Sequence, residues 1–351
     1  MRILYAIQGT GNGHSSRALE IIPILQEYGE VDILISGNQS QVELPFEVNY
    51  RFHGLSFVAS KSGGISFIKS LLNIKLFRLF NEIRKLNVER YNLVISDYEP
   101  ISAWACAIRN IKCVQLSHQA AVMHTESPKP DIKHYVGNYV LNHYCPSTVK
   151  YGFHFEKYAE SIFTPVIRQQ VRDLAPSDQG HYVVYLPAYH DEVLFQFLWN
   201  FSARWVVFSK YTSEPFTKDN VTFLPVDNEQ FLKELASCKG VMCGAGFELP
   251  AETMYLKKKL MVIPMENQFE QQCNAVSLKR MGVSVLPKLD LINYRAMYNW
   301  LNFARPVQVE YTNDTKAILE RIIHEHAIQL EEMNESSPAP KMNWQFFRYF
   351  F

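Results

Sequence analysis

The chain of 351 residues is 47% hydrophobic and 20% charged, which is the balance of a soluble globular protein. Its 35 basic residues equal its 35 acidic residues, so no overall positive field favours nucleic acid as a partner. No stretch approaches the ~20 consecutive apolar residues that a membrane-spanning helix needs.

Strands and helices alternate along the first half of the chain, which predicts a parallel sheet covered on both faces. Arg2–Ile7 reads as a buried strand, and its position leaves no room for a signal peptide. The following helix contains Pro23, which should kink or shorten it. Further strands are predicted at residues 31–36, 93–96 and 111–116. Pro100 suits the first turn of the helix that follows residue 96.

A break near residues 164–179, which include Pro165 and Pro176, separates a second series of strands and helices. Its predicted strands are residues 182–186, 205–208, 221–224, 241–243 and 260–263. Asp227 and Gln230 form a capping box for one of its helices. The length also suits two domains of ~150–200 residues. The prediction is an α/β protein of two doubly wound domains whose strand ends face one cleft, where such sheets bind ligands.

The cysteines indicate the compartment. There are six, with no Cys-x-x-Cys pair and no regular spacing, at positions 106, 113, 145, 238, 243 and 273. This pattern favours buried reduced thiols. We therefore expect a cytoplasmic protein, which can still lie on the inner face of the membrane.

The turn after the first strand reads Gly9-Thr10-Gly11-Asn12-Gly13-His14. Glycines let the backbone approach a ligand, and the N-terminus of the next helix favours an anion. A dinucleotide fingerprint needs a glycine in place of His14, and the second strand ends in Ser36-Gly37 without an acidic side chain for a ribose. The turn therefore disfavours hydride transfer, and it is either a ligand-binding turn or simply a tight one.

His14 lies on the first helical turn, at the carboxyl edge of the predicted sheet. The positive end of the helix dipole favours a neutral imidazole, which can act as a base. Asp97 ends a neighbouring strand at the same edge and can hold the imidazole in the required tautomer. The alternatives are that His14 only caps the helix, with Asp97 binding acceptor, or that His118 is the base.

The segment from Cys243 to Ala275 combines three features. A strand ends in Gly-Ala-Gly, and the next helix presents backbone N–H groups to an anion. Glu252 lies about one turn into that helix and can accept hydrogen bonds from two vicinal hydroxyls. Another strand ends at Pro264, and its loop brings Gln271 and Gln272 to the same edge. Consecutive strand–helix units would thus bind the phosphate, the ribose and the sugar of one ligand.

This layout resembles the C-terminal nucleotide-sugar site of GT-B glycosyltransferases. It is similar to the group of the bacterial peptidoglycan N-acetylglucosaminyltransferase and the UDP-glycosyltransferases. The resemblance implies donor-binding roles for Gly244, Ala245, Gly246, Phe247, Glu252, Gln271 and Gln272. On the acceptor or phosphate side it implies Gly11, Asn12, Gly13 and His118, and for catalysis the pair His14 and Asp97. The sequences around Asp97 and His118 also resemble a poorly characterised prokaryotic branch.

The resemblance further implies a GT-B fold of two Rossmann-like domains. Residues 1–165 would form the acceptor-side domain, 166–180 a linker, 181–330 the nucleotide-sugar domain and 331–351 a tail docking back on the first domain. One departure is Lys257-Lys258-Lys259, which stands where family members usually have Gly-x-Pro.

We expect transfer of a sugar from a nucleotide-sugar, UDP-linked by family likeness, to an acceptor that the sequence does not identify. The reaction is expected to be inverting and independent of metal and cofactor, and no Asp-x-Asp motif occurs. One alternative is a nucleotide-sugar 2-epimerase of the same fold. Another is a catalytically idle protein that binds nucleotide-sugars or lipid surfaces.

The segment Lys61–Lys85 carries six Lys or Arg residues against one acid. It predicts a solvated helix packed on the domain edge. The alternative is an acceptor-side surface that meets anionic membrane lipid. That alternative connects the protein to a lipid-linked or glycan acceptor of the cell envelope.

Overall fold

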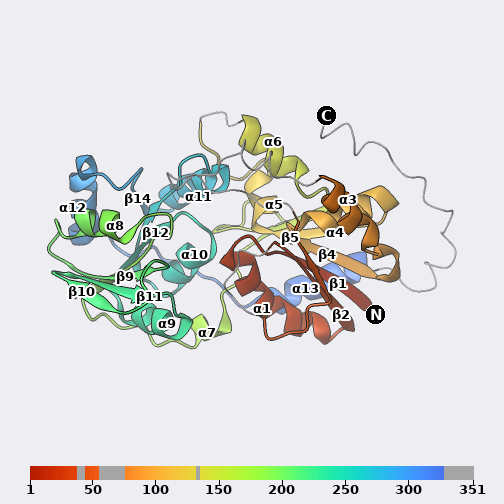
Figure 1. Ribbon diagram of the computed structural model, residues 1–351, viewed down its shortest axis with the longest axis horizontal. Coiled ribbons are helices and arrows are strands. Elements are labelled where there is room, and N and C mark those ends of the chain that lie inside the picture. The colour runs from red at the N-terminus through yellow and green to blue at the C-terminus, as the bar shows by residue number, and fades with distance from the viewer. Residues whose placement is uncertain (38–43, 55–75, 132–134, 328–351) are drawn as a thin grey trace.

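The structure is a computed structural model that describes residues 1–37, 44–54, 76–131 and 135–327. It contains two α/β lobes, each built on a seven-stranded sheet with helices on both faces (Figure 1). The lobes are the two predicted doubly wound domains.

The first sheet is parallel throughout, in the order β3-β2-β1-β4-β5-β6-β7. Its strands are β1 Arg2–Gln8, β2 Glu30–Ser36, β3 Tyr50–Phe52, β4 Leu93–Asp97, β5 Val114–Ser117, β6 Val149–Phe153 and β7 Ile162–Phe163. Its helices are α1 Asn12–Gln26, α3 Leu76–Lys85, α4 Pro100–Arg109, α5 His118–Met123 and α6 Tyr135–His143. The prediction ended this sheet at residue 116, but β6 and β7 continue it.

The second sheet has the order β10-β11-β9-β8-β12-β13-β14, with only β10 antiparallel to its neighbour. Its strands are β8 His181–Tyr185, β9 Arg204–Ser209, β10 Phe216–Lys218, β11 Val221–Pro225, β12 Gly240–Gly244, β13 Lys259–Ile263 and β14 Ser284–Val285. Its helices are α8 Asp191–Leu198, α9 Asn228–Ser237, α10 Glu248–Tyr255, α11 Phe269–Arg280 and α12 Tyr294–Phe303. The predicted strands of this half are all present.

Local sequence explains where the helices begin. The Glu99 carboxylate accepts hydrogen bonds from two backbone N–H groups at the start of α4, and Pro100 occupies the first turn as predicted. Asp227 caps α9 by accepting from the N–H of Gln230 at 2.8 Å, whereas the Gln230 side chain bonds Glu234 instead of closing the box. Pro23 lies inside α1, which nevertheless continues to Gln26.

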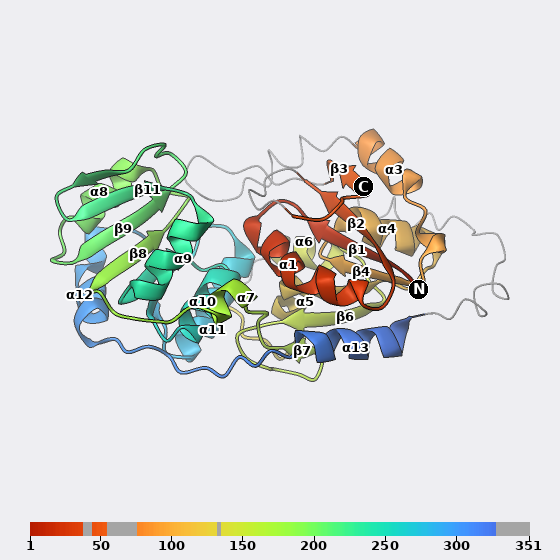
Figure 2. The same ribbon diagram turned by 90° about the horizontal axis from the view of Figure 1, so that it is seen from below.

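The chain crosses between the domains twice. The first crossing is the linker, residues 166–180, which contains α7 Gln169–Arg172, and the second is the return segment, residues 304–314, which leads to α13 Thr315–His326. Figure 2 shows both crossings running between the lobes.

Helix α13 requires a correction to the predicted boundary. The sequence assigned residues 181–330 to the second domain, yet α13 packs against α1 of the first. Its apolar residues Ile318, Leu319 and Ile322 are buried there, and the Lys316 ammonium lies 2.6 Å from the Glu27 carboxylate. The amphipathic face of α13 therefore completes the core of the first domain. The predicted tail, residues 331–351, lies outside the described residues.

The basic segment Lys61–Lys85 is described only from Leu76 onward, as α3. Leu79 and Ile83 are buried in the first domain, while Phe77 is 89% exposed. Among the described residues, no helix is both long and apolar enough to cross a bilayer. All six cysteines lie in the described part of the chain, and each is a buried free thiol.

Candidate active site

The carboxyl ends of the two sheets carry the predicted residues. Asp97 is the last residue of β4 and pairs in register with Ile7 of β1, so His14 on the first turn of α1 lies nearby. Gly244 ends β12, and Gln271 lies on α11 after β13. Parallel strands place all these groups at one edge of each sheet.

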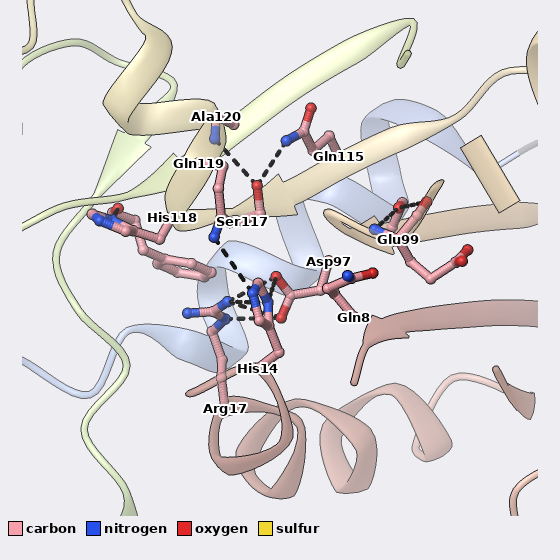
Figure 3. Close-up of polar contacts among 12 residues, drawn as sticks. Gln8, His14, Arg17, Asp97, Glu99, Gln115, Ser117, His118, Gln119 and Ala120 are labelled. Atoms are coloured by element: carbon pink, nitrogen blue, oxygen red, sulfur yellow. Dashed lines mark hydrogen bonds and ion pairs between the residues drawn. The ribbon is translucent and has the colours of Figure 1, made fainter. Parts of the chain in front are cut away.

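His14, Asp97 and Arg17 form one cluster (Figure 3). The His14 Nδ1 atom lies 2.9 Å from Asp97 Oδ1. Arg17, one turn further along α1, donates from Nη2 to Asp97 Oδ1 at 2.7 Å and from Nε to Oδ2 at 3.1 Å. The predicted pair is therefore a triad whose third member, Arg17, the sequence analysis did not identify.

The neighbours of His14 favour one tautomer. Nδ1 faces Asp97 at 2.9 Å and the Arg17 Nη2 donor at 3.2 Å, and the carboxylate is the closer partner. The other ring nitrogen, Nε2, lies 3.4 Å from the amide nitrogen of Gln119, which can only donate. A proton on Nδ1 satisfies Asp97, and the Nε2 lone pair then faces Gln119. The basic nitrogen is the one directed away from Asp97.

The charges of this cluster are balanced within the protein. Burial alone raises the pKa of Asp97, but the Arg17 charge and, less strongly, His14 outweigh it and leave that pKa below its usual value. Burial lowers the pKa of Arg17, and the opposing charges of Asp97 and Glu248 raise it. Asp97 is thus an anion and Arg17 a cation at neutral pH, although both are almost completely buried.

Arg17 also joins the two domains. Its Nη1 donates to Oε1 of Glu248 at 2.7 Å, and Glu248 is the first residue of α10 in the second domain. A Cβ atom on Gly13 would overlap the Glu248 carboxylate, so glycine at this position permits the contact. Gly11 has an extended backbone and open space beside it. Neither its φ angle nor steric crowding therefore requires glycine at this position.

Two more residues of the first domain reach across the cleft. Asn12, on the predicted acceptor side, bonds the Tyr185 side chain at the end of β8. Gln119 donates to Oε2 of Glu270, on the first turn of α11, at 3.0 Å. Ser117 caps α5 and thereby places Gln119 on the first turn of that helix. Polar side chains of the chain itself therefore bond the two domains to each other where the sheet edges face.

His118 does not occupy an acceptor-facing position, which corrects the prediction. It is 2% exposed, with Nδ1 at 2.8 Å from the Phe153 carbonyl and Nε2 at 2.8 Å from Oδ1 of Asn274. Burial is the main cause of its lowered pKa. Its ring stacks on Phe247 of the donor turn, with centroids 3.9 Å apart. His118 is an interdomain contact and has no free nitrogen to act as a base in this arrangement.

The donor turn follows β12. Ala245 is fully buried, and its carbonyl accepts from the Asn274 amide at 3.1 Å. Phe247 immediately precedes α10 and makes no side-chain capping bond. Gln271 lies beside Gly244, and its Oε1 accepts from the Met265 N–H at 2.9 Å. The predicted glycine turn and the predicted sugar-binding glutamine are thus adjacent.

Glu252 is not exposed for a ribose in this arrangement. It is 3% exposed and holds Arg168 of the linker by two hydrogen bonds, from Nε at 2.6 Å and Nη2 at 2.9 Å. Glu252 lies about one turn into α10, as predicted, but the sequence analysis did not identify Arg168. A ribose could reach this carboxylate only after the arginine leaves it.

Three amide oxygens near the start of α11 have no partner. Among the described residues, Oε1 of Gln119, Gln268 and Gln272 is buried without a hydrogen bond. A buried polar atom left unbonded costs about 1–3 kcal/mol. Each oxygen can accept a hydrogen bond from a hydroxyl, which is the group that sugars supply. Gln272 was predicted to hold the donor sugar, whereas Gln119 and Gln268 were not.

Two Rossmann-like domains that meet at the carboxyl edges of their sheets form the GT-B fold. The chain matches glycosyl transferase family 1 over residues 1–303 and belongs to this family. It is accordingly a sugar-transferring enzyme. No curated protein matches the chain.

Solved structures with the same fold are distant in sequence. MurG of Acinetobacter baumannii is 12% identical, with a TM-score of 0.55 over 92% of this chain and 99% of that one. The spinosyn forosaminyltransferase SpnP is 11% identical, with a TM-score of 0.55 over 93% and 96%. S. aureus MnaA, described as a co-structure with UDP, is 9% identical, with a TM-score of 0.51 over 97% and 99%. These likenesses establish the fold.

Proposed function

We propose that the enzyme transfers a sugar from a UDP-sugar to an acceptor hydroxyl, with inversion and without a metal ion. The proposal rests on one observation. The basic nitrogen of His14 lies beside the Gln119 amide nitrogen, which donates a hydrogen bond to Glu270 of the second domain. Gln268 and Gln272, with their unbonded oxygens, flank Glu270 on α11. A base and a set of hydroxyl-binding amides thus occur together. The UDP bound to MnaA supports the choice of nucleotide.

The chemistry follows from these positions. An acceptor hydroxyl takes the place of the Gln119 amide at His14 Nε2, and the imidazole removes its proton as the oxygen attacks the anomeric carbon. The bond to UDP breaks on the opposite face, and UDP leaves with the electron pair. Asp97 stabilises the imidazolium that forms. The N–H groups at the start of α10 stabilise the charge on the departing diphosphate.

The donor and the reaction are tested together. Thermal unfolding should be followed with UDP, dTDP, GDP, ADP and CDP, because a ligand that binds only the folded state raises the melting temperature. We expect the largest increase with UDP, and slow release of UDP from at least one UDP-sugar incubated without acceptor. An epimerised nucleotide-sugar would instead identify a 2-epimerase. Binding without any turnover would identify an idle binding protein.

Glu252 and Arg168 give a matched pair of variants, because each breaks the same ion pair. If Glu252 binds the ribose, Glu252→Gln should weaken UDP binding about tenfold or more, as expected for a hydrogen bond to a charged group. Arg168→Gln frees the carboxylate and should leave UDP binding unchanged or tighter. Isothermal titration measures both. Equal weakening in the two variants would mean that the ion pair is structural and that Glu252 does not bind ribose.

A further inference from the structure

A second concave site lies on the opposite side of the second domain. It is a groove of about 950 Å³ between the linker, the turn from α10 to β13, and the return segment. Lys239 precedes β12 and Lys259 begins β13, so the groove lies at the amino edge of the sheet. The candidate active site lies at the carboxyl edge. The five-residue strand β12 separates the two edges by about 15 Å.

The groove is strongly cationic although the whole chain is neutral. Its lining contains the five cations Arg172, Lys239, Lys257, Lys258 and Lys259. It contains only two carboxylates, those of Asp178 and Glu310. In the described part of the chain, no carboxylate lies within ion-pair distance of any of these cations.

These cations differ in their burial and in their hydrogen bonds. Lys258 is buried, and its ammonium donates to three backbone carbonyls, including those of Ala236 at 2.7 Å and Cys238 at 2.8 Å. The ammonium groups of Lys239 and Lys257 have no hydrogen-bond partner among the described residues. Burial, and then the charge of Lys239, lowers the pKa of Lys259. Lys239 and Lys259 therefore repel each other, and a bound anion would relieve that repulsion.

The backbone at Lys257 gives an independent indication. Lys257 has φ of 55°, in the left-handed region that favours glycine, and it ends α10 with its N–H bonded to the Met254 carbonyl. A side chain other than glycine costs about 1–2 kcal/mol there. The chain thus keeps a lysine at a position with a backbone cost, and the charge of that lysine adds to the positive charge of the groove.

The groove also contacts both interdomain crossings. Arg172 of the linker donates to the backbone carbonyls of Tyr311 and Thr312 in the return segment, each at 3.0 Å. The Arg172 guanidinium stacks on the Tyr255 ring, 5.0 Å from its centroid. A ligand in this groove would therefore touch the linker, the return segment and the turn that ends α10.

We propose that this groove binds a small ligand carrying two or more linked phosphate groups, separately from the donor in the cleft. Lys239 and Lys257 would contact the phosphates directly. Lys258 would add fixed positive charge from beneath, while Arg172 holds the two crossings together. The proposal does not depend on the proposed function, because it concerns different residues at the other edge of the sheet.

The test uses the full chain and inorganic tripolyphosphate, titrated calorimetrically. The double variant Lys239→Gln/Lys257→Gln should bind tripolyphosphate at least tenfold more weakly than the wild type, with an unchanged melting temperature in its absence. The double variant Lys233→Gln/Lys279→Gln removes the same number of charges from exposed lysines on α9 and α11, outside the groove, and should bind normally. An excess of UDP, which would occupy the cleft, should not displace tripolyphosphate.

Three results would overturn the proposed groove site. Wild-type affinity in the groove variant would refute the site. A similar loss in Lys233→Gln/Lys279→Gln would show that tripolyphosphate responds only to net charge. Displacement of tripolyphosphate by UDP would place the phosphates in the cleft, and the proposed groove site would then be wrong.

Discussion

Replacing His14 with alanine is expected to lower the turnover number about a hundredfold or more, with the affinity for UDP nearly unchanged. The physical reason is that an acceptor hydroxyl is a poor nucleophile unless a positioned base takes its proton. His14 Nε2 is the only nitrogen of the ring that is directed away from Asp97. Initial rates at saturating donor and acceptor, together with UDP titration, measure both quantities.

The control for this prediction is His324→Ala. His324 lies exposed on α13, so this variant also removes an imidazole without touching the cleft. It should keep wild-type turnover. If His14→Ala does so as well, His14 is not the base. His118 would then have to be tested, and it could act only after losing its contacts with Phe153 and Asn274.

Replacing Arg17 with methionine is expected to lower the free energy of unfolding by about 3–5 kcal/mol, because it leaves the buried Asp97 carboxylate without its cation. The matched control is Arg2→Met, which breaks the Arg2–Glu30 pair at the surface, where the side chains are 55% and 75% exposed. Exposed pairs contribute less than about 1 kcal/mol. Urea denaturation of both variants measures the difference.

A second variant keeps the Arg17 prediction testable if the single variant folds poorly. Arg17→Met/Asp97→Asn removes the unpaired charge and should recover part of the lost stability. Its stability should also depend less on acid. The folded pKa of Asp97 is lowered, so the stability this group contributes is present above its unfolded pKa and is lost as the pH falls through the folded value. A cost for Arg17→Met no larger than for Arg2→Met would contradict the ion-pair account.

Much of the fold could be predicted because most strands are continuous apolar runs. The exceptions are informative. β6 reads Val149-Lys150-Tyr151-Gly152-Phe153, in which a lysine and a glycine interrupt the apolar pattern. A Cβ at Gly152 would collide with Ala121 of α5, so the glycine is needed for helix packing and not for a turn. Strands β7 and β14 have two residues each, too short for any period to be visible.

The proximity of His14 and Asp97 could be predicted because strand ends converge by topology alone. Arg17 was missed, although it lies three residues after His14 and therefore on the same helix face. That spacing was the available signal. No local pattern, by contrast, could reveal Glu248 beside Arg17 or Arg168 on Glu252, because both contacts join residues more than 80 positions apart that meet only in the folded chain.

The two crossings of the chain have a mechanical consequence. Two connections limit how far the domains can slide apart, and a hinge rotation is the motion they hinder least. Arg172 ties the crossings to each other, so the pivot of such a rotation would lie beside them. Such a rotation displaces the far edge most and the axis least. The Arg17–Glu248 contact lies close to that pivot, because Glu252, one turn further along α10, bonds Arg168 of the linker. Contacts between the domains that lie farther from the crossings would therefore part before it.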